Sequence, residues 1–141
     1  MVALAAIFLT VRLFPEGEGQ PVAWQDLSSQ VGPLTFAYPE HRVFRKRAEL
    51  ARYLRAAQAA RPAPAVDFSS RQVLVVSPGP RSSTGYSVEV LSARKRGERI
   101  GVRVRERTPR VGADVDPRVT YPYRLISLPA DGEVYVDWVD R

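Results

Sequence analysis

The sequence predicts an α+β domain, built mostly of antiparallel β-sheet in a sandwich or half-barrel with one covering helix. Two patterns lead to this prediction. Apolar and polar residues alternate through much of the second half of the chain, as they do in strands with one buried face. Residues 48–60, in contrast, have apolar residues at helical spacing. The chain has 141 residues, 45% of them hydrophobic, which suffices for one domain with its own core.

The chain begins with an apolar run, residues 1–14, which we interpret as a hydrophobic export or anchor segment. The run is shorter than the roughly 20 residues of a spanning helix and matches a signal-peptide core in length. No basic residue precedes it and no small-residue cleavage site follows it, so a helix or strand docked on the domain is the alternative. Residues 15–21 are rich in Pro, Gly and Glu and predict a linker. We therefore expect an extracytoplasmic domain, residues 22–141, attached to the cell membrane by the N-terminal segment.

Short strands are expected at the start of the domain, over residues 22–27, 34–38 and 42–44, because Gly and Pro residues separate these stretches. The helix over 48–60 follows. Its apolar face consists of Leu50, Tyr53, Leu54 and Ala57. Basic residues precede the helix, where its dipole disfavours positive charge, so we expect a poorly capped start.

Residues 72–76 are almost continuously apolar and predict a central strand covered on both faces, with the helix over one of them. A further strand is expected over 119–128, where Pro122 favours an edge position or a bulge. The turn residues 129–132 then predict a hairpin into a last strand, residues 133–139.

The alternating segments on either side of the basic turn 94–97 predict another β-hairpin. Matching their buried faces pairs Val90 with Val102. The same register places Glu89 opposite Arg103, as a cross-strand ion pair worth at most about 1 kcal/mol.

Composition excludes several kinds of chemistry. The chain has no cysteine, which excludes disulfides, thiolate catalysis and cysteine metal sites. His41 is the only histidine, and no G-x-S-x-G elbow surrounds any serine, so neither a histidine-rich metal site nor a serine-protease-type triad is expected. Asp114 and Asp116 fall short of the roughly 6 to 8 oxygen ligands of calcium. We therefore expect no enzymatic activity, no metal and no cofactor.

A polar loop with one glycine precedes the strand that begins near Tyr86. Gly85 can adopt a positive φ without strain, so the loop can turn sharply and present its side chains. Tyrosines at strand spacing further along share one face. The candidate partner-binding residues are Ser83, Thr84, Gly85, Tyr86, Thr108, Pro109, Tyr121 and Tyr123. The alternative is local: Gly85 serves a bulge, and Tyr86 belongs to the core.

The net charge is +6, from 21 basic and 15 acidic residues. Basic side chains gather on the predicted hairpin and form a candidate basic patch. Its residues are Arg94, Lys95, Arg96, Arg103, Arg105 and Arg107. As an alternative function, residues 94–110 could bind nucleic acid or an anionic envelope polymer. Arginine on the outward face of a strand is also what alternation demands, and the recognition signatures of nucleic-acid-binding folds are missing.

Several short motifs occur in a fixed order between Trp24 and Trp138. They are Pro64-Ala-Val-Asp-Phe-Ser69, Gly79, Ser83-Thr-Gly-Tyr-Ser87, Thr108-Pro109 and Thr120-Tyr-Pro-Tyr123. On these motifs the chain resembles the PrcB family, whose C-terminal domain is named for an accessory subunit of an exported subtilisin-like protease complex. The resemblance implies a non-catalytic extracytoplasmic domain that assists or stabilises a protein partner such as an exported protease. Many relatives look like lipoproteins, but this chain lacks the cysteine that such attachment needs.

The sequence Thr84-Gly85-Tyr86 is also similar to the loop with which chagasin-type inhibitors enter the clefts of cysteine proteases. The chain lacks the arginine-proline-tryptophan loop of those inhibitors. This absence argues against cysteine-protease inhibition.

Overall fold

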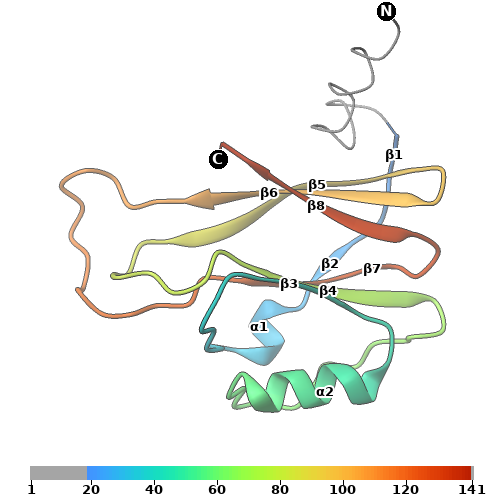
Figure 1. The fold of residues 1–141 in the computed structure, drawn as a ribbon, viewed down its shortest axis with the longest axis horizontal. Coiled ribbons are helices and arrows are strands. Elements are labelled where there is room, and N and C mark those ends of the chain that lie inside the picture. The colour runs from blue at the N-terminus through green and yellow to red at the C-terminus, as the bar shows by residue number, and fades with distance from the viewer. Residues whose placement is uncertain (1–18, 141) are drawn as a thin grey trace, which may run out of the picture.

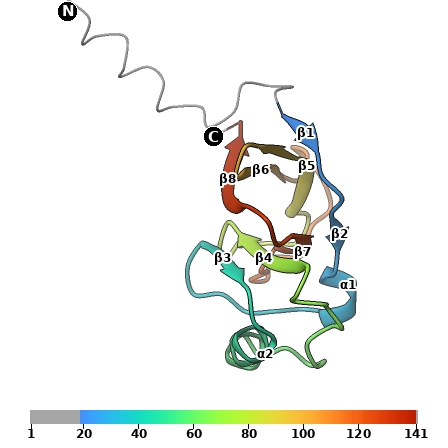
Figure 2. The ribbon, with the colours of Figure 1, turned by 90° about the vertical axis from the view of Figure 1, so that its right-hand side faces the viewer.

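Two four-stranded sheets and two helices form three layers in the computed structural model of the chain, which describes residues 19–140 (Figures 1 and 2). The first sheet has the order β1 (Gln20–Pro21), β5 (Ser87–Arg96), β6 (Arg99–Arg107), β8 (Glu133–Val139). The second sheet has the order β2 (Gln25–Asp26), β7 (Arg124–Pro129), β4 (Arg71–Ser77), β3 (Glu40–Phe44). The helices are α1 (Ser28–Val31) and α2 (Arg47–Ala56). The predicted β-rich α+β class is confirmed, and both sheets are open rather than closed into a barrel.

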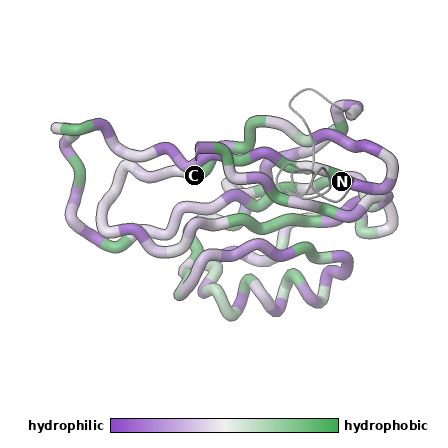
Figure 3. The backbone as a smooth tube through the Cα atoms, turned by 45° about the horizontal axis from the view of Figure 1, so that its top comes forward, coloured by the Kyte–Doolittle hydropathy of each residue, from purple (hydrophilic) through white to green (hydrophobic). Residues whose placement is uncertain are grey.

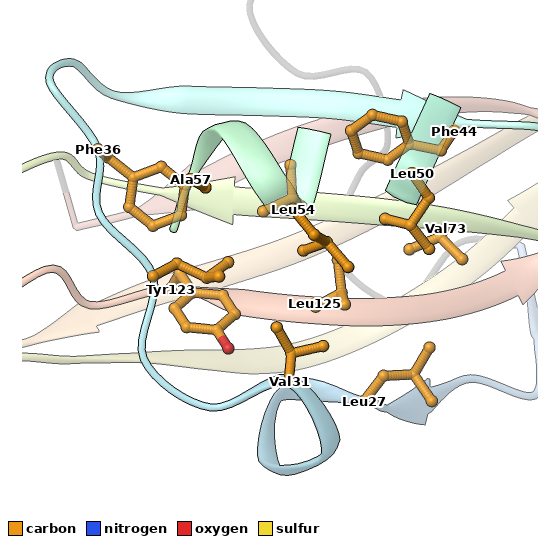
Figure 4. Close-up of a cluster of buried hydrophobic side chains, with 12 residues drawn as sticks. Leu27, Val31, Phe36, Phe44, Leu50, Leu54, Ala57, Val73, Tyr123 and Leu125 are labelled. Atoms are coloured by element: carbon orange, nitrogen blue, oxygen red, sulfur yellow. The ribbon is translucent and has the colours of Figure 1, made fainter. Parts of the chain in front are cut away.

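The second sheet separates two hydrophobic cores. One core lies between the sheets, and the other lies between the second sheet and the helices (Figure 4). Strand β4 contributes to both, since Leu74 and Val76 face the first sheet while Val73 and Val75 face the helices. It lies between β3 and β7, so the predicted central strand with two covered faces is confirmed.

Helix α2 packs on this sheet through Leu50 and Leu54, as its spacing predicts. Lys46 precedes it without a side-chain capping hydrogen bond, which agrees with the poorly capped start. The helix ends at Ala56, earlier than predicted, because the chain turns at Gln58, whose φ is +63°.

The start of the domain differs from the prediction. Residues 34–38 form no strand; Leu34 and Phe36 are buried because this loop packs against the helix side of the core, where the Thr35 amide donates to the Ala57 carbonyl. Of the predicted strand 22–27, only β2 is a strand. The strand expected over 42–44 is confirmed as part of β3. The predicted linker ends in β1, whose two residues pair with β5.

Strands β5 and β6 form the predicted antiparallel hairpin, but its predicted register is wrong. Val90 lies opposite Val104, and Glu89 lies opposite Arg105. The cause is a β-bulge at Leu91 together with a tight turn at residues 97–98, which shift the pairing by two positions.

The last two strands correct the predicted topology. Strand β7 begins at Arg124, after Pro122, and lies between β2 and β4 rather than at an edge. The predicted hairpin into the last strand is wrong, because residues 129–132 cross to the other sheet, where β8 pairs parallel with β6. Two hydrogen bonds stabilise this crossing: the Gln72 side-chain amide donates to the carbonyls of Pro129 and Gly132 at 2.7 and 2.8 Å.

The predicted export or anchor segment, residues 1–14, lies outside the described residues. Within residues 19–140, no helix combines the length and the apolar character needed to cross a membrane.

Candidate functional site

Two loops extend together beyond the sheets at one end of the sandwich (Figures 1 and 3). We call residues 81–86 and 108–120 the joined-loop end. The loops are connected near their base by an antiparallel bridge in which Arg81 and Thr120 exchange backbone hydrogen bonds of 2.8 and 2.9 Å. The Thr120 hydroxyl also donates to the Ser83 carbonyl at 2.7 Å.

Thr84 extends the connection toward the tip. Its amide donates to the Asp116 carbonyl at 3.1 Å, and its hydroxyl accepts from the Asp116 amide at 2.9 Å. Because the amide and the hydroxyl of Thr84 both form hydrogen bonds with Asp116, the alignment of the two loops is fixed.

The two loops approach each other closely at Gly85. Its φ is +96°, a backbone conformation that side chains disfavour, and a Cβ there would lie 2.9 Å from the Pro109 Cβ and 3.2 Å from the Val115 Cγ1. The structure thus brings the predicted residues Gly85 and Pro109 into contact. The glycine is needed because the other loop occupies the space that a side chain would take.

Tyr86 is half-buried, so it is neither a fully presented side chain nor a core residue, the two alternatives stated from the sequence. The Arg81 guanidinium lies 5.9 Å from the centre of its ring and makes a bidentate ion pair with Glu106, at 2.7 and 2.8 Å. Hydrogen bonding to this carboxylate raises the pKa of Arg81 above its ordinary value. Tyr86 therefore lies under a fixed cation at the base of the joined-loop end.

The most exposed apolar side chains of this end were not predicted. Val111 is fully exposed, and Val119 is exposed on the same loop. Val111 stands at the corner of a turn that the Ala113 amide closes onto the Arg110 carbonyl at 2.9 Å, with Gly112 at φ +81° beside it. The sequence signal was the pair Val111-Gly112 in a polar loop, where a valine has no core to enter.

The remaining predicted partner-binding residues differ in their placement. Thr108 is exposed and Ser83 is partly buried, both in the joined-loop end. Tyr123 instead belongs to the core on the helix side (Figure 4), and Tyr121 packs against that core. The Tyr123 hydroxyl donates to the carbonyls of Gly32 and Ser28, and burial raises its pKa to about 12. These two tyrosines are thus structural contacts rather than part of the loop surface.

The basic patch lies mostly on the outer face of the first sheet, where carboxylates pair with it. Glu89 accepts from Arg107 at 2.6 Å and from Arg105 at 3.0 Å, and these hydrogen bonds lower its pKa to about 2. Asp137 lies 3.7 Å from Arg103.

The rest of the basic patch lies near the hairpin turn. Lys95 pairs with Asp131 at 2.6 Å, and Arg94 donates to the Gly19 carbonyl at 3.1 Å. Arg96 is exposed where the hairpin turns. The patch is therefore a face of alternating charge for most of its length, which reduces its attraction for a polyanion.

Among the residues considered for catalysis or metal binding, His41 lies on β3, whereas Asp114 and Asp116 lie in the loop between β6 and β7. His41 is exposed on β3 and lies opposite Val76 of the neighbouring strand β4. In the part of the chain from 19 to 140, no cluster of three or more His, Cys, Asp or Glu residues could hold a metal ion. Asp116 serves the joined-loop end through its backbone.

Comparison with known protein families gives a match within the chain. Residues 72–129 match the family model described as PrcB C-terminal. This segment runs from β4 through β7, so it includes the joined-loop end and all the motifs that carried the resemblance except residues 64–69. No curated protein and no solved structure matches the chain. The resemblance stated from the motifs is thereby confirmed over residues 72–129, where the chain is similar to the PrcB C-terminal family.

Proposed function

We propose that this chain is a non-catalytic protein-binding domain that contacts its partner through the joined-loop end. The partner in this proposal is an exported protease, which the domain stabilises or modulates, in keeping with the accessory subunit after which the PrcB family is named. The family match supports a PrcB-like protein. The partner and its contact surface are our inference.

The observation that carries the proposal is an apolar tip on a braced loop. Protein interfaces gain most of their free energy from a few side chains that the partner buries fully, and they gain more when those anchors are held in place before binding. In this proposal Val111 is the anchor, which is supported by its exposure at the turn beside Gly112 and by the hydrogen bonds between Thr84 and Asp116 that hold the loop behind it.

The proposed location is extracytoplasmic, with the N-terminal apolar segment as the membrane attachment. Its support is the composition of residues 1–14 and the role of the family's namesake. In this arrangement the chain enters the fold at β1, which pairs with β5 near the β5–β6 turn. The joined-loop end lies at the opposite ends of β5 and β6.

The alternative, binding of nucleic acid or an anionic polymer through residues 94–110, has weaker support. A polyanion-binding surface needs cations that phosphate groups can reach. Here Glu89 already engages Arg105 and Arg107, so a polyanion would first have to displace that carboxylate.

The test is capture of partners from the cell envelope with the full chain and with Val111→Asp. The proposal expects the variant to lose the partner that the wild type retains, and mass spectrometry identifies that protein. Moderate salt should leave capture intact, because the contact is mainly apolar, whereas polyanion binding falls steeply with salt.

Ala65→Asp is the matched control, since Ala65 is also exposed and the same charge is added on the helix side of the molecule. Equal recovery of the same proteins by the wild type and both variants would rule out Val111 as the contact. Loss of the partner in both variants would assign the effect to added charge.

A further inference from the structure

A second surface feature lies on the helix side, away from the first sheet. A pocket of about 330 Å³ opens between α2 and the chain segment that leaves it, residues 59–63. Figure 2 shows α2 with this segment running beside it before β4 begins. The floor of the pocket is formed by small or aliphatic side chains: Ala51, Leu54, Ala59 and Ala63.

Three arginines, Arg47, Arg55 and Arg61, line this pocket. Arg47 donates to the Pro64 carbonyl at 3.3 Å, and Arg61 donates to the Ser29 carbonyl at 2.8 Å. A carbonyl acceptor occupies one of the five guanidinium N–H groups and leaves the charge uncompensated. The Arg55 side chain makes no hydrogen bond or ion pair with any residue between 19 and 140.

The walls of the pocket supply no negative charge. Residues 57–66 contain no Asp or Glu. Glu49 is the only acidic residue of α2, and helical geometry places it about 160° around the axis from Arg47. The next carboxylate along the chain, Asp67, accepts from the Ser69 hydroxyl at 2.6 Å. The three guanidiniums therefore surround an apolar floor without a carboxylate among them.

We propose that this pocket binds a peptide segment in which a carboxylate stands next to a small aliphatic side chain. The carboxylate would accept hydrogen bonds from the arginines, for which guanidinium geometry is well suited, and the aliphatic group would cover Leu54 and the alanines. The volume lies at the small end of the range for ligand pockets. This site is separate from the joined-loop end, so the proposal does not depend on the proposed function.

The test is an NMR titration of the full chain with short peptides. N-acetyl-Ala-Ala carries a terminal carboxylate, N-acetyl-Ala-Glu amide carries a side-chain carboxylate, and N-acetyl-Ala-Ala amide carries none. Saturable shifts of the amides of residues 51–63 are expected with a carboxylate peptide. The uncharged amide should bind at least about tenfold more weakly, because charge-assisted hydrogen bonds are lost. The tighter of the two acidic peptides identifies the source of the carboxylate.

Arg55→Gln should weaken binding of the acidic peptide several-fold. Arg52→Gln removes the same charge from an exposed position of α2 that does not line the pocket, and it should leave binding within about twofold. Equal weakening by both variants would overturn the proposal in favour of diffuse attraction to a basic helix. Equal affinity for the carboxylate peptide and its amide, or for inorganic phosphate and the carboxylate peptide, would also overturn it.

Discussion

Thr84 and Asp116, 32 positions apart in the chain, hold each other through two hydrogen bonds, one between backbones and one from the Asp116 amide to the Thr84 hydroxyl. This pair links a loop that resembles an inhibitor loop to a loop with an exposed valine. The first loop therefore acts as a brace, and the second presents the side chains. The roles differ from those that the sequence alone suggests, where Thr84-Gly85-Tyr86 is itself the presenting loop.

Thr84→Val tests the brace. The change removes the hydroxyl acceptor and keeps the shape, so it should lower the free energy of unfolding by about 1 kcal/mol. Hydrogen exchange at the amide of Asp116 should become faster. Thr108→Val is the control, because Thr108 is exposed and makes no side-chain hydrogen bond within the described part of the chain. Unchanged exchange at Asp116 in Thr84→Val would contradict the role of the hydroxyl.

Gly85→Ala tests the close approach of the loops. The new Cβ would meet Pro109 in a backbone conformation that alanine disfavours, so we expect a loss of roughly 2 to 3 kcal/mol in unfolding experiments. Gly112→Ala has a similar φ of +81° but open space around its Cβ, so it should cost only about 1 kcal/mol. If the two variants are equally stable, contact with Pro109 adds nothing.

The ion pairs of Glu89 predict a pH dependence. Its pKa is lowered from 4.5 to about 2 by hydrogen bonds from Arg107 and Arg105, so the charged form is favoured in the folded state. A lowered pKa means that this stabilisation is present above about pH 4.5 and is lost as the pH falls toward 2. The Tm difference between the wild type and Glu89→Gln should therefore shrink over that interval. A Tm difference that stays constant over this interval would show that the ion pairs do not contribute. At neutral pH, added salt should also reduce the Tm difference, because the pairs are exposed.

Tyr123→Phe tests the assignment of this tyrosine to the core. The variant leaves the Gly32 carbonyl without this donor and removes one of the two donors to the Ser28 carbonyl, so unfolding should require about 1 to 2 kcal/mol less free energy. Tyr121→Phe is the matched control, because the Tyr121 hydroxyl makes no hydrogen bond to residues 19–140. Equal effects of the two changes would contradict the structural role of the Tyr123 hydroxyl. Direct titration should place the pKa of Tyr123 near 12.

Patterns of apolar and polar residues along the chain predicted several strands correctly. Alternation identified β5, β6 and β8, and the apolar stretch identified β4 as central. Pairing was harder, because alternation is the same in parallel and antiparallel strands, and the parallel pairing of β6 with β8 was missed. The bulge at Leu91 also left no signal that the side-chain pattern could reveal.

The candidate site was predicted only in part, because local sequence patterns do not show how distant segments of the chain meet. Gly85 and Pro109 were both named from the sequence, but their contact depends on how two distant loops meet. Tyr123 was assigned to the surface set because strand spacing does not say which face is buried. Val111 was overlooked, since an isolated valine in a loop is ordinarily assigned to the nearest core.

The central claim is that Val111 contacts a protein partner, and a photo-crosslinking amino acid at position 111 tests it most directly. Introduced in the full chain in living cells, it should give one discrete protein adduct, and the same group at position 65 should give none. The adduct should become weaker when Gly85→Val disturbs the brace while the domain remains folded. No adduct from position 111, or the same adducts from 111 and 65, would contradict the claim.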